Sequence, residues 1–484
     1  MRIADCSKRL VLAILVTLLS APAAAQETSE VERLRTAVEQ LEKTVQELKA
    51  RLSALEKEKA AAPVQQPQQQ PAPAPTSPAP TPTPAPTAGL VPDYNTMGDQ
   101  QPAAPRPDNV PLDPELKGFL PIPGTLSMVR FGGSARVDAI YDLANNGNPN
   151  WFVPSSIPVP GQSGTDGGGR FTLQAKATRM SLEFRRPFGS SDRLRIYYEN
   201  DFFGDSSSPT MTYRLRHFYG QAWNFLLGQT FSAFANVDSW PDTVDYEGPN
   251  AMIMKRQPQV RYTQPLSRTP EDRQVVFLSV EQSGSEVDVS GFPPDGAGAN
   301  RLPDFVLGYR RERKIGHVQL STILRSIGID SVARGDEKIL GWGFNLSGAV
   351  NVLAADNVSY QIAYGEGIAR YVNDLSGLNM DAGADESGNL KAIPVFAPAI
   401  GYNHRWSAFF RSTASWGYVW TDPVASLGPL TVRRTQYAGL NLVWQPTKAF
   451  RSGLEYLWGR KETVNGASRD ASRIGFVVKY DLVK

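Results

Sequence analysis

The sequence has little cysteine, little histidine and no long apolar run. Its single cysteine, Cys6, lies in a segment that we expect to be removed, which excludes disulfides, thiolate metal sites and cysteine nucleophiles from the mature protein. The longest apolar run, residues 10–19, is half of the roughly 20 residues that a membrane-spanning helix needs, so a polytopic helical membrane protein is excluded. Lysine and arginine number 50 against 48 aspartate and glutamate, and this balance gives nucleic-acid binding no support.

Residues 1–25 have the layout of a secretory signal peptide. Basic residues come first, followed by the apolar run and by three alanines before Gln26. A membrane anchor is the alternative, but ten apolar residues are too few to cross a bilayer. We therefore expect cleavage after Ala25.

Residues 28–59 carry apolar residues at alternating steps of three and four, which predicts a coiled coil: Val31, Leu34, Val38, Leu41, Val45, Leu48, Leu52 and Leu55. A lone amphipathic helix packed on a globular domain would need a wider apolar face. Valine at a with leucine at d favours a parallel dimer in model peptides, but so few heptads leave the number of chains open. Residues 60–128 form a Pro-rich linker, which predicts an extended spacer.

Over residues 129–484 apolar residues alternate with polar ones in stretches of about ten residues. In the first stretch, Phe131, Val137 and Tyr141 share one face. Arg136 and Asp138 share the other. Apolar-out, polar-in strands with aromatic residues near their ends are typical of a transmembrane β-barrel. A soluble sandwich is the alternative, but its polar face would look outward while its apolar faces pack together. We expect an all-β fold, an antiparallel transmembrane barrel of about sixteen strands.

Long and short connections alternate along this region. Long segments rich in Gly, Pro, Asp and Asn are expected near residues 144–170, 236–250, 283–302, 327–337, 373–390, 421–431 and 461–470. Short turns are expected near residues 187–192, 224, 265–272, 311–315, 353–357, 403–406 and 446–448. Outer-membrane barrels have long extracellular loops and short periplasmic turns. Both termini would then lie in the periplasm, with the coiled coil beneath the barrel.

Arginine outnumbers lysine by 29 to 9 over residues 129–484, against 34 acidic residues. The alternation points five arginines of the first four strands into the lumen as candidate substrate-binding residues: Arg136, Arg179, Arg195, Arg214 and Arg216. Guanidinium groups suit bidentate capture of carboxylates or phosphates. In the alternative, the arginines are neutralised by Glu183, Glu199 or Asp201 on the same faces. If Arg214 and Arg216 both point inward, strict alternation along the strand places His217 on the lipid side.

Residues 232–250 form an unusually acidic connection. Its carboxylates are Asp238, Asp242, Asp245 and Glu247, and Trp240 and Tyr246 lie among them. If this loop folds inward, it sets negative groups opposite the arginines and narrows the channel. An exposed acidic loop is equally compatible with the composition.

Nothing in the sequence marks a catalytic site, a cofactor site or a metal site. The histidines are widely spaced and form no metal-ligand set: His217, His317 and His404. A barrel hydrolase would need a serine and a histidine that converge on one face, and no pattern indicates this pair. We expect no enzyme activity.

Four stretches carry a resemblance to a known family: FGGSARVDAIYD (131–142), YRLRHFYGQAWNFLLGQTFSAF (213–234), VDYEGPN (244–250) and QPQVRYTQP (257–265). They resemble the DcaP-like porins, trimeric outer-membrane channels associated with dicarboxylate uptake, and the order of signal, coiled coil, spacer and barrel is similar too. The resemblance implies a homotrimer of sixteen-stranded barrels and a constriction loop at residues 235–250. The chain departs from the usual aromatic end of outer-membrane barrels, because it finishes YDLVK after Tyr480.

We therefore expect an outer-membrane porin for small anionic solutes, with carboxylates and dicarboxylates preferred. A phosphate-selective porin is the close alternative, because guanidinium groups suit either anion. A structural barrel that tethers the envelope without transport is a further alternative.

Overall fold

The computed structural model describes residues 43, 46, 119–188, 192–205, 210–269, 271–353 and 355–482. Backbone contacts divide the chain into residues 1–83 and 84–484. In the first unit the described residues are Lys43 and Gln46, both helical and exposed. The predicted signal peptide, the rest of the coiled coil and most of the Pro-rich linker lie outside the described residues, so they stay predictions.

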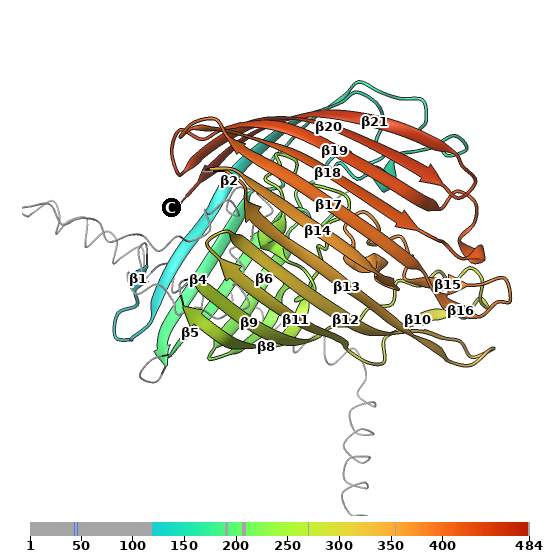
Figure 1. Cartoon of the computed structure of the whole chain (residues 1–484), viewed down its shortest axis with the longest axis horizontal. Helices are drawn as coiled ribbons and strands as arrows, with labels where there is room; N and C mark the ends of the chain where they lie inside the picture. The colour runs from blue at the N-terminus through green and yellow to red at the C-terminus, as the bar shows by residue number, and fades with distance from the viewer. Residues whose placement is uncertain are drawn as a thin grey trace, which may run out of the picture. The chain divides into compact units, whose positions relative to one another are not determined.

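Residues 128–481 form a closed antiparallel barrel of sixteen strands, which confirms the expected fold class (Figure 1). The strands β3 and β4 count as one strand of the wall, because both pair with β2. The wall consists of β2 (Met128–Asp142), β3 (Arg170–Gln174) with β4 (Arg179–Phe188), β5 (Asp192–Asp201), β6 (Arg214–Ala222), β7 (Phe225–Phe231), β8 (Arg256–Thr269), β9 (Asp272–Glu281), β11 (Asp304–Arg313), β12 (Gly316–Asp330), β13 (Glu337–Asn351), β14 (Asn357–Glu366), β17 (Pro394–Arg405), β18 (Phe410–Thr421), β19 (Val432–Trp444), β20 (Phe450–Thr463) and β21 (Ser468–Asp481). Pairing of β21 with β2 closes the barrel, so no strand edge is left exposed to lipid.

Smaller elements decorate the barrel. They are the strands β1 (Leu120–Pro121) and β10 (Ala297–Ala299), the hairpin β15 (Ala382–Ala384) and β16 (Leu390–Ala392), and the 3-10 helices η2 (Pro154–Ser156), η3 (Val237–Ser239), η4 (Ala369–Tyr371) and η5 (Ala425–Leu427). No helix among the described residues is long and apolar enough to cross a bilayer.

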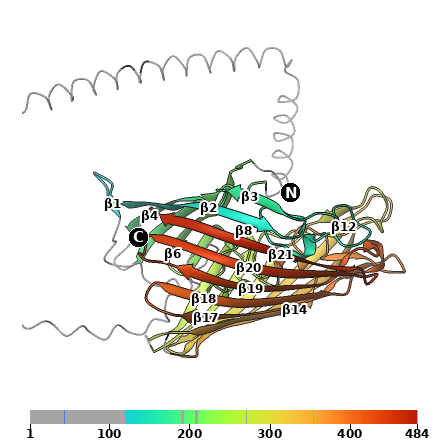
Figure 2. The ribbon, with the colours of Figure 1, turned by 90° about the horizontal axis from the view of Figure 1, so that it is seen from above.

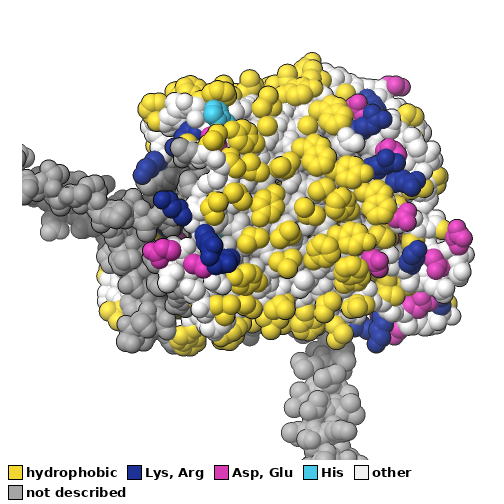
Figure 3. Space-filling model, viewed as in Figure 1, with side chains coloured by type: hydrophobic (Ala, Val, Ile, Leu, Met, Phe, Trp, Pro, Cys, Tyr) yellow, Lys and Arg dark blue, Asp and Glu magenta, His cyan; other side chains and the backbone are white. Residues whose placement is uncertain are grey.

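The alternation of the strands separates an apolar outside from a polar inside. On β2, Phe131, Val137 and Tyr141 are exposed on the outer surface. Arg136 and Asp142 of the same strand are buried inside the barrel. Figure 3 shows a broad belt of hydrophobic side chains on the outer face, with charged side chains gathered at its two ends. A belt of this kind suits a hydrocarbon environment.

The connections alternate as expected, with two corrections. The prediction missed the connection at residues 202–213 between β5 and β6, which supplies the eighth loop and brings the strand count to sixteen. The segments expected to be long near residues 327–337 and 461–470 are partly strand, and the connections there span only residues 331–336 and 464–467. In these two segments Gly, Asp and Asn residues lie at or near the ends of the strands, so the composition of each segment resembles that of a loop. The chain enters β2 and leaves β21 at the end that carries the short turns, where Figures 1 and 2 show the C-terminus.

The prediction that His217 lies on the lipid side is wrong. In the pairing of β5 with β6, Glu199 faces His217 and the next residue, Asn200, faces Leu215, so β6 carries one extra residue at this point. This β-bulge lets Arg216 and His217 both point inward and be buried. The His217 ring lies 3.0 Å, Nδ1 to Oγ1, from Thr230 of β7.

Candidate functional site

The connection between β7 and β8, residues 232–255, folds into the barrel and is called L3. Its apolar residues, among them Phe234, Trp240 and Ile253, are buried. They pack in one cluster with wall residues such as Ile323 of β12 and Val419 of β18. This apolar contact holds L3 against one side of the wall, so the acidic segment folds inward rather than outward.

Three of the four predicted loop carboxylates anchor L3 to the wall. Asp238 lies 2.7 Å from Nη2 of Arg310 on β11. Asp242 lies 2.7 Å from Nε of Arg411 on β18 and 2.9 Å from Nη2 of Arg451 on β20. The third, Asp245, lies 3.7 Å from Nη1 of Arg473 on β21. None of these arginine partners is among the five arginines that the sequence predicted as substrate-binding residues.

The tip of L3 crosses to the opposite wall through Tyr246. Its hydroxyl donates to Asp201 of β5 and accepts from Arg214 and Arg216 of β6, with 2.8 Å to Nη2 of Arg214. The guanidinium of Arg179 on β4 lies 5.6 Å from the centre of the Tyr246 ring. L3 therefore bridges the lumen between the arginine-bearing strands β4–β6 and the strands β11, β18, β20 and β21.

The structure brings together three of the five predicted arginines, Arg179, Arg214 and Arg216, around Tyr246. Arg195 lies near the short-turn end of β5, 2.7 Å from Glu183. Arg136 pairs with Asp138 and donates to the carbonyl of Val244 in L3, at 2.7 Å. The five arginines thus form a cluster of three with two outliers.

Wall carboxylates neutralise part of this cluster. Arg216 lies 2.6 Å from Glu199 and 2.9 Å from Asp201, and Arg214 lies 2.6 Å from Asp201. Arg179 is 4.0 Å from Glu199, and its Nε and Nη2 donors are buried without a hydrogen-bond acceptor among the described residues. The neutralisation is therefore incomplete.

A cavity of about 200 Å³ lies beside this cluster and is called the constriction cavity. It is lined by Trp151, Arg214, Arg216, Phe231, Trp240, Tyr246, Glu247, Met254, Arg256, Asn373 and Ser376. Trp151 comes from the loop between β2 and β3, and Asn373 and Ser376 come from the loop between β14 and β17. Three loops and the strands β6, β7 and β8 thus meet at one small polar space.

The cavity is rich in hydrogen-bond donors and poor in acceptors. Nη2 of Arg216 and Nε1 of both Trp151 and Trp240 are buried without an acceptor among the described residues. Arg256 stacks on the ring of Phe231 at 4.8 Å and forms no ion pair with a described residue. The carboxylate of Glu247 likewise has no ion pair there. Such a site is suited to a ligand that brings its own oxygen acceptors and negative charge.

Sequence reasoning missed Arg256. Strict alternation along β8 points Gln257, Gln259 and Arg261 inward, and all three are buried, so Arg256 would be counted as lipid-facing. At the first residue of the strand, however, the chain leaves L3, and Arg256 packs against Phe231 and the cavity. The sequence pattern also gave no role to Tyr246, whose hydroxyl contacts Asp201, Arg214 and Arg216.

The environment of Glu247 predicts pH-dependent selectivity. Burial, with the nearby carboxylate of Asp245, raises the pKa of Glu247 to about 7. Its side chain is then neutral below pH 7 and negative above it, so the preference for anions should strengthen as the pH falls from 8 to 6. Zero-current potentials in a salt gradient measure this. In Glu247→Gln the change of preference with pH should be smaller; an unchanged pH profile would contradict the assignment.

Comparison with known proteins agrees with this architecture. Residues 118–482 match the profile of the DcaP outer membrane protein family. The crystal structure of the outer membrane channel DcaP of Acinetobacter baumannii is similar, with a TM-score of 0.64 and 23% identity over 75% of this chain and 99% of that chain. An anion-selective porin from Comamonas acidovorans matches more distantly, with a TM-score of 0.48 and 9% identity over 74% of this chain and 100% of that one. No curated protein sequence matches the chain significantly. The chain therefore belongs to the DcaP outer membrane protein family and has the fold of an outer-membrane porin.

Proposed function

We propose that this porin passes small hydrophilic solutes by passive diffusion and prefers anions, with carboxylates and dicarboxylates favoured. The observation that carries the proposal is the excess of cations at the constriction cavity. The cations are Arg214, Arg216 and Arg256, which line the cavity, and Arg179, which lies against the Tyr246 ring beside it. Their wall partners are Glu199 and Asp201, so four positive charges meet two negative ones, or three when Glu247 is ionised. A net positive patch in a narrow lumen concentrates anions.

The donors at the cavity support a carboxylate as the preferred anion. A guanidinium presents two parallel N–H groups that match the two oxygens of a carboxylate. Arg256 is the arginine best placed for this, because no described carboxylate occupies it. A dicarboxylate can engage Arg256 with one end and the Arg214–Arg216 pair with the other. Phosphate is the competing solute class, since its oxygens fit the same donors.

Planar bilayers test the proposal. We expect a single-channel conductance and, across a gradient of potassium chloride, a zero-current potential of the sign that anion permeation requires. Succinate and phosphate, added to chloride solutions in turn, should both reduce the current, with succinate effective at the lower concentration. The reverse order would favour a phosphate-selective porin. A barrel that conducts no ions would favour the tethering role instead.

We also propose a homotrimer in the bacterial outer membrane, as the family resemblance implies, with the coiled coil of residues 28–59 in the periplasm. Chemical cross-linking of the full mature chain in native membranes tests this. Three linked copies are expected. Loss of the trimer on deletion of residues 28–59 would assign its assembly to the coiled coil, whereas trimers that persist would assign it to the barrel.

A further inference from the structure

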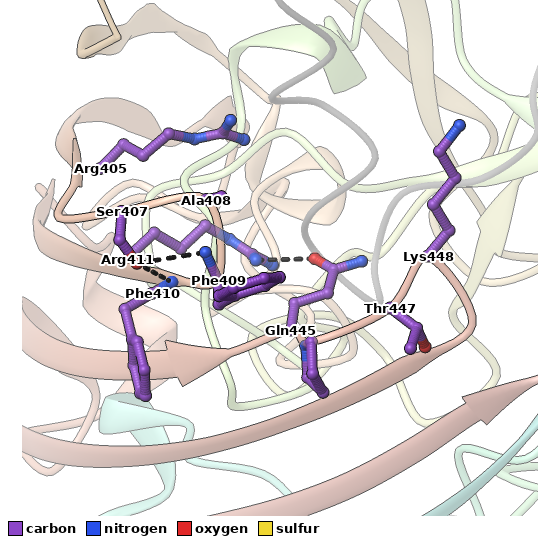
Figure 4. A pocket seen from close by; sticks show the side chains of 10 residues that line it. Arg405, Ser407, Ala408, Phe409, Phe410, Arg411, Gln445, Thr447 and Lys448 are labelled. Atoms are coloured by element: carbon purple, nitrogen blue, oxygen red, sulfur yellow. Dashed lines mark hydrogen bonds between the residues drawn. The ribbon is translucent and has the colours of Figure 1, made fainter.

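A second cavity, of about 360 Å³, lies at the opposite end of the barrel wall, between two short turns. One turn, residues 406–409, joins β17 to β18, and the other, residues 445–449, joins β19 to β20. The backbone N–H of Gln445 donates to the carbonyl of Phe409 at 2.8 Å, which ties the two turns together. Figure 4 shows Arg405 and Lys448 on opposite sides of this space, with Arg411 and Gln445 between them.

The cations of this rim cavity are poorly compensated. Its lining residues include Arg405, Arg411 and Lys448 and no carboxylate. Arg405 and Lys448 are exposed and form no ion pair with a described residue. Arg411 is buried and reaches Asp242 through Nε, but its Nη2 is buried without an acceptor among the described residues. A buried guanidinium donor left open in this way is costly unless a ligand accepts from it.

Each neutral polar side chain of the rim cavity already accepts at least one hydrogen bond and has a donor left over. Ser407 Oγ accepts from the backbone N–H groups of Phe409 and Phe410, both at 3.2 Å. Thr447 Oγ1 accepts from the N–H of Phe450 at 3.1 Å. Oε1 of Gln445 accepts from Nη1 of Arg411 at 2.7 Å. Two hydroxyl hydrogens and the Gln445 amide N–H groups therefore remain to be donated.

We propose that the rim cavity is a second binding site for a small oxyanion, a carboxylate or a phosphate, at the periplasmic mouth of the pore. Three cationic side chains and three neutral donors surround the space, and its lining includes no carboxylate. The position at the short-turn end makes it an exit site for anions that have passed L3. Arg411 joins the two regions, because it also holds Asp242 of L3. The exit role rests on the proposed anion transport, but binding at this cavity does not.

Crystals of the mature chain soaked in selenate test binding without transport, because selenium scatters anomalously. A selenate peak between Arg405, Arg411 and Lys448 is expected. The double variant Arg405→Gln/Lys448→Gln should lose it. The matched control Arg186→Gln/Lys314→Gln removes two exposed cations near other short turns and should keep it. No peak in the natural protein, or an equal peak in the first double variant, would overturn the site.

A current measurement tests the same site in solution. Succinate added on the short-turn side should reduce the current at a concentration that rises about tenfold in Arg405→Gln/Lys448→Gln, as loss of two charged donors predicts. Succinate on the loop side should act as before. Phospholipid retained in native mass spectra, and lost in that variant, would show that the cavity holds a lipid phosphate and would overturn the solute site. A porin that binds selenate here but shows no anion preference would refute the proposed function and leave the site intact.

Discussion

Replacing Arg256 by glutamine is expected to weaken the anion preference of the channel more than any other single change of charge on the wall. Arg256 lines the constriction cavity, rests on Phe231 and has no carboxylate partner among the described residues. Its charge is therefore available to a passing solute, whereas Arg214 and Arg216 share theirs with Asp201. Glutamine keeps a donor at the site and leaves no buried carboxylate unpaired, so the fold should be unaffected.

The size of this effect follows from Coulomb's law. Two unit charges about 4 Å apart interact by about 1 kcal/mol in water and more in a confined lumen. Loss of Arg256 should thus weaken binding of a monocarboxylate at least about fivefold, and that of a dicarboxylate further. The zero-current potential in a potassium chloride gradient and the concentration of succinate that halves the current both report the change.

The matched control for Arg256 is Arg261→Gln on the same strand. Arg261 is buried and donates to Gln259 and to the carbonyl of Phe231, and it does not line the constriction cavity. An equal loss of anion preference in both variants would mean that the total charge of the lumen, rather than the cavity, sets selectivity. An unchanged potential in Arg256→Gln would remove this residue from the proposed mechanism.

Replacing Asp242 by asparagine is expected to detach L3 from the strands β18 and β20 and to raise the single-channel conductance. Asp242 is buried and pairs with both Arg411 and Arg451. Removal of one partner from a buried ion pair costs about 3–5 kcal/mol, because the remaining charges stay buried without compensation. The barrel strands keep their hydrogen bonds, so this cost falls on the position of L3 rather than on assembly of the barrel.

Two measurements distinguish release of L3 from a simple change of charge. Recordings at high salt, which screens charge, should still show the larger conductance. A protease specific for glutamate should cleave after Glu247 in Asp242→Asn under conditions that leave the natural protein intact. The control Asp470→Asn breaks an exposed ion pair with Arg460 and should change neither result. A conductance that stays the same in Asp242→Asn would show that L3 does not limit the pore.

The barrel was predictable because its wall sorts side chains by a strict period of two. Lipid outside and water inside demand opposite residue types at successive positions, and Phe131, Arg136 and Val137 of β2 follow this rule. The inward arginines Arg179 and Arg195 were found in the same way. The rule fails where the backbone departs from it, as at the bulge beside Arg216 and at the first residue of β8, Arg256.

The contacts of L3 could not be predicted from local pattern. Asp238, Asp242 and Asp245 meet arginines that lie between 72 and 228 residues further along the chain, on strands that come near only after the barrel has closed. Acidic composition alone was equally compatible with an exposed loop. The apolar residues of L3 favour the inward position, because Phe234, Trp240 and Ile253 would be exposed to water if L3 pointed outward.

The sequence by itself determined that this chain forms a transmembrane barrel, which strands carry inward arginine, and which connection is acidic, since all three follow from the order of residue types along one strand or loop. Only the tertiary structure decided which charges remain available to a solute. That depends on which partners closure of the barrel brings within about 4 Å. Among the described residues, closure leaves Arg256 without an ion pair and the rim cavity with unused donors, while Asp242 is paired with Arg411 and Arg451.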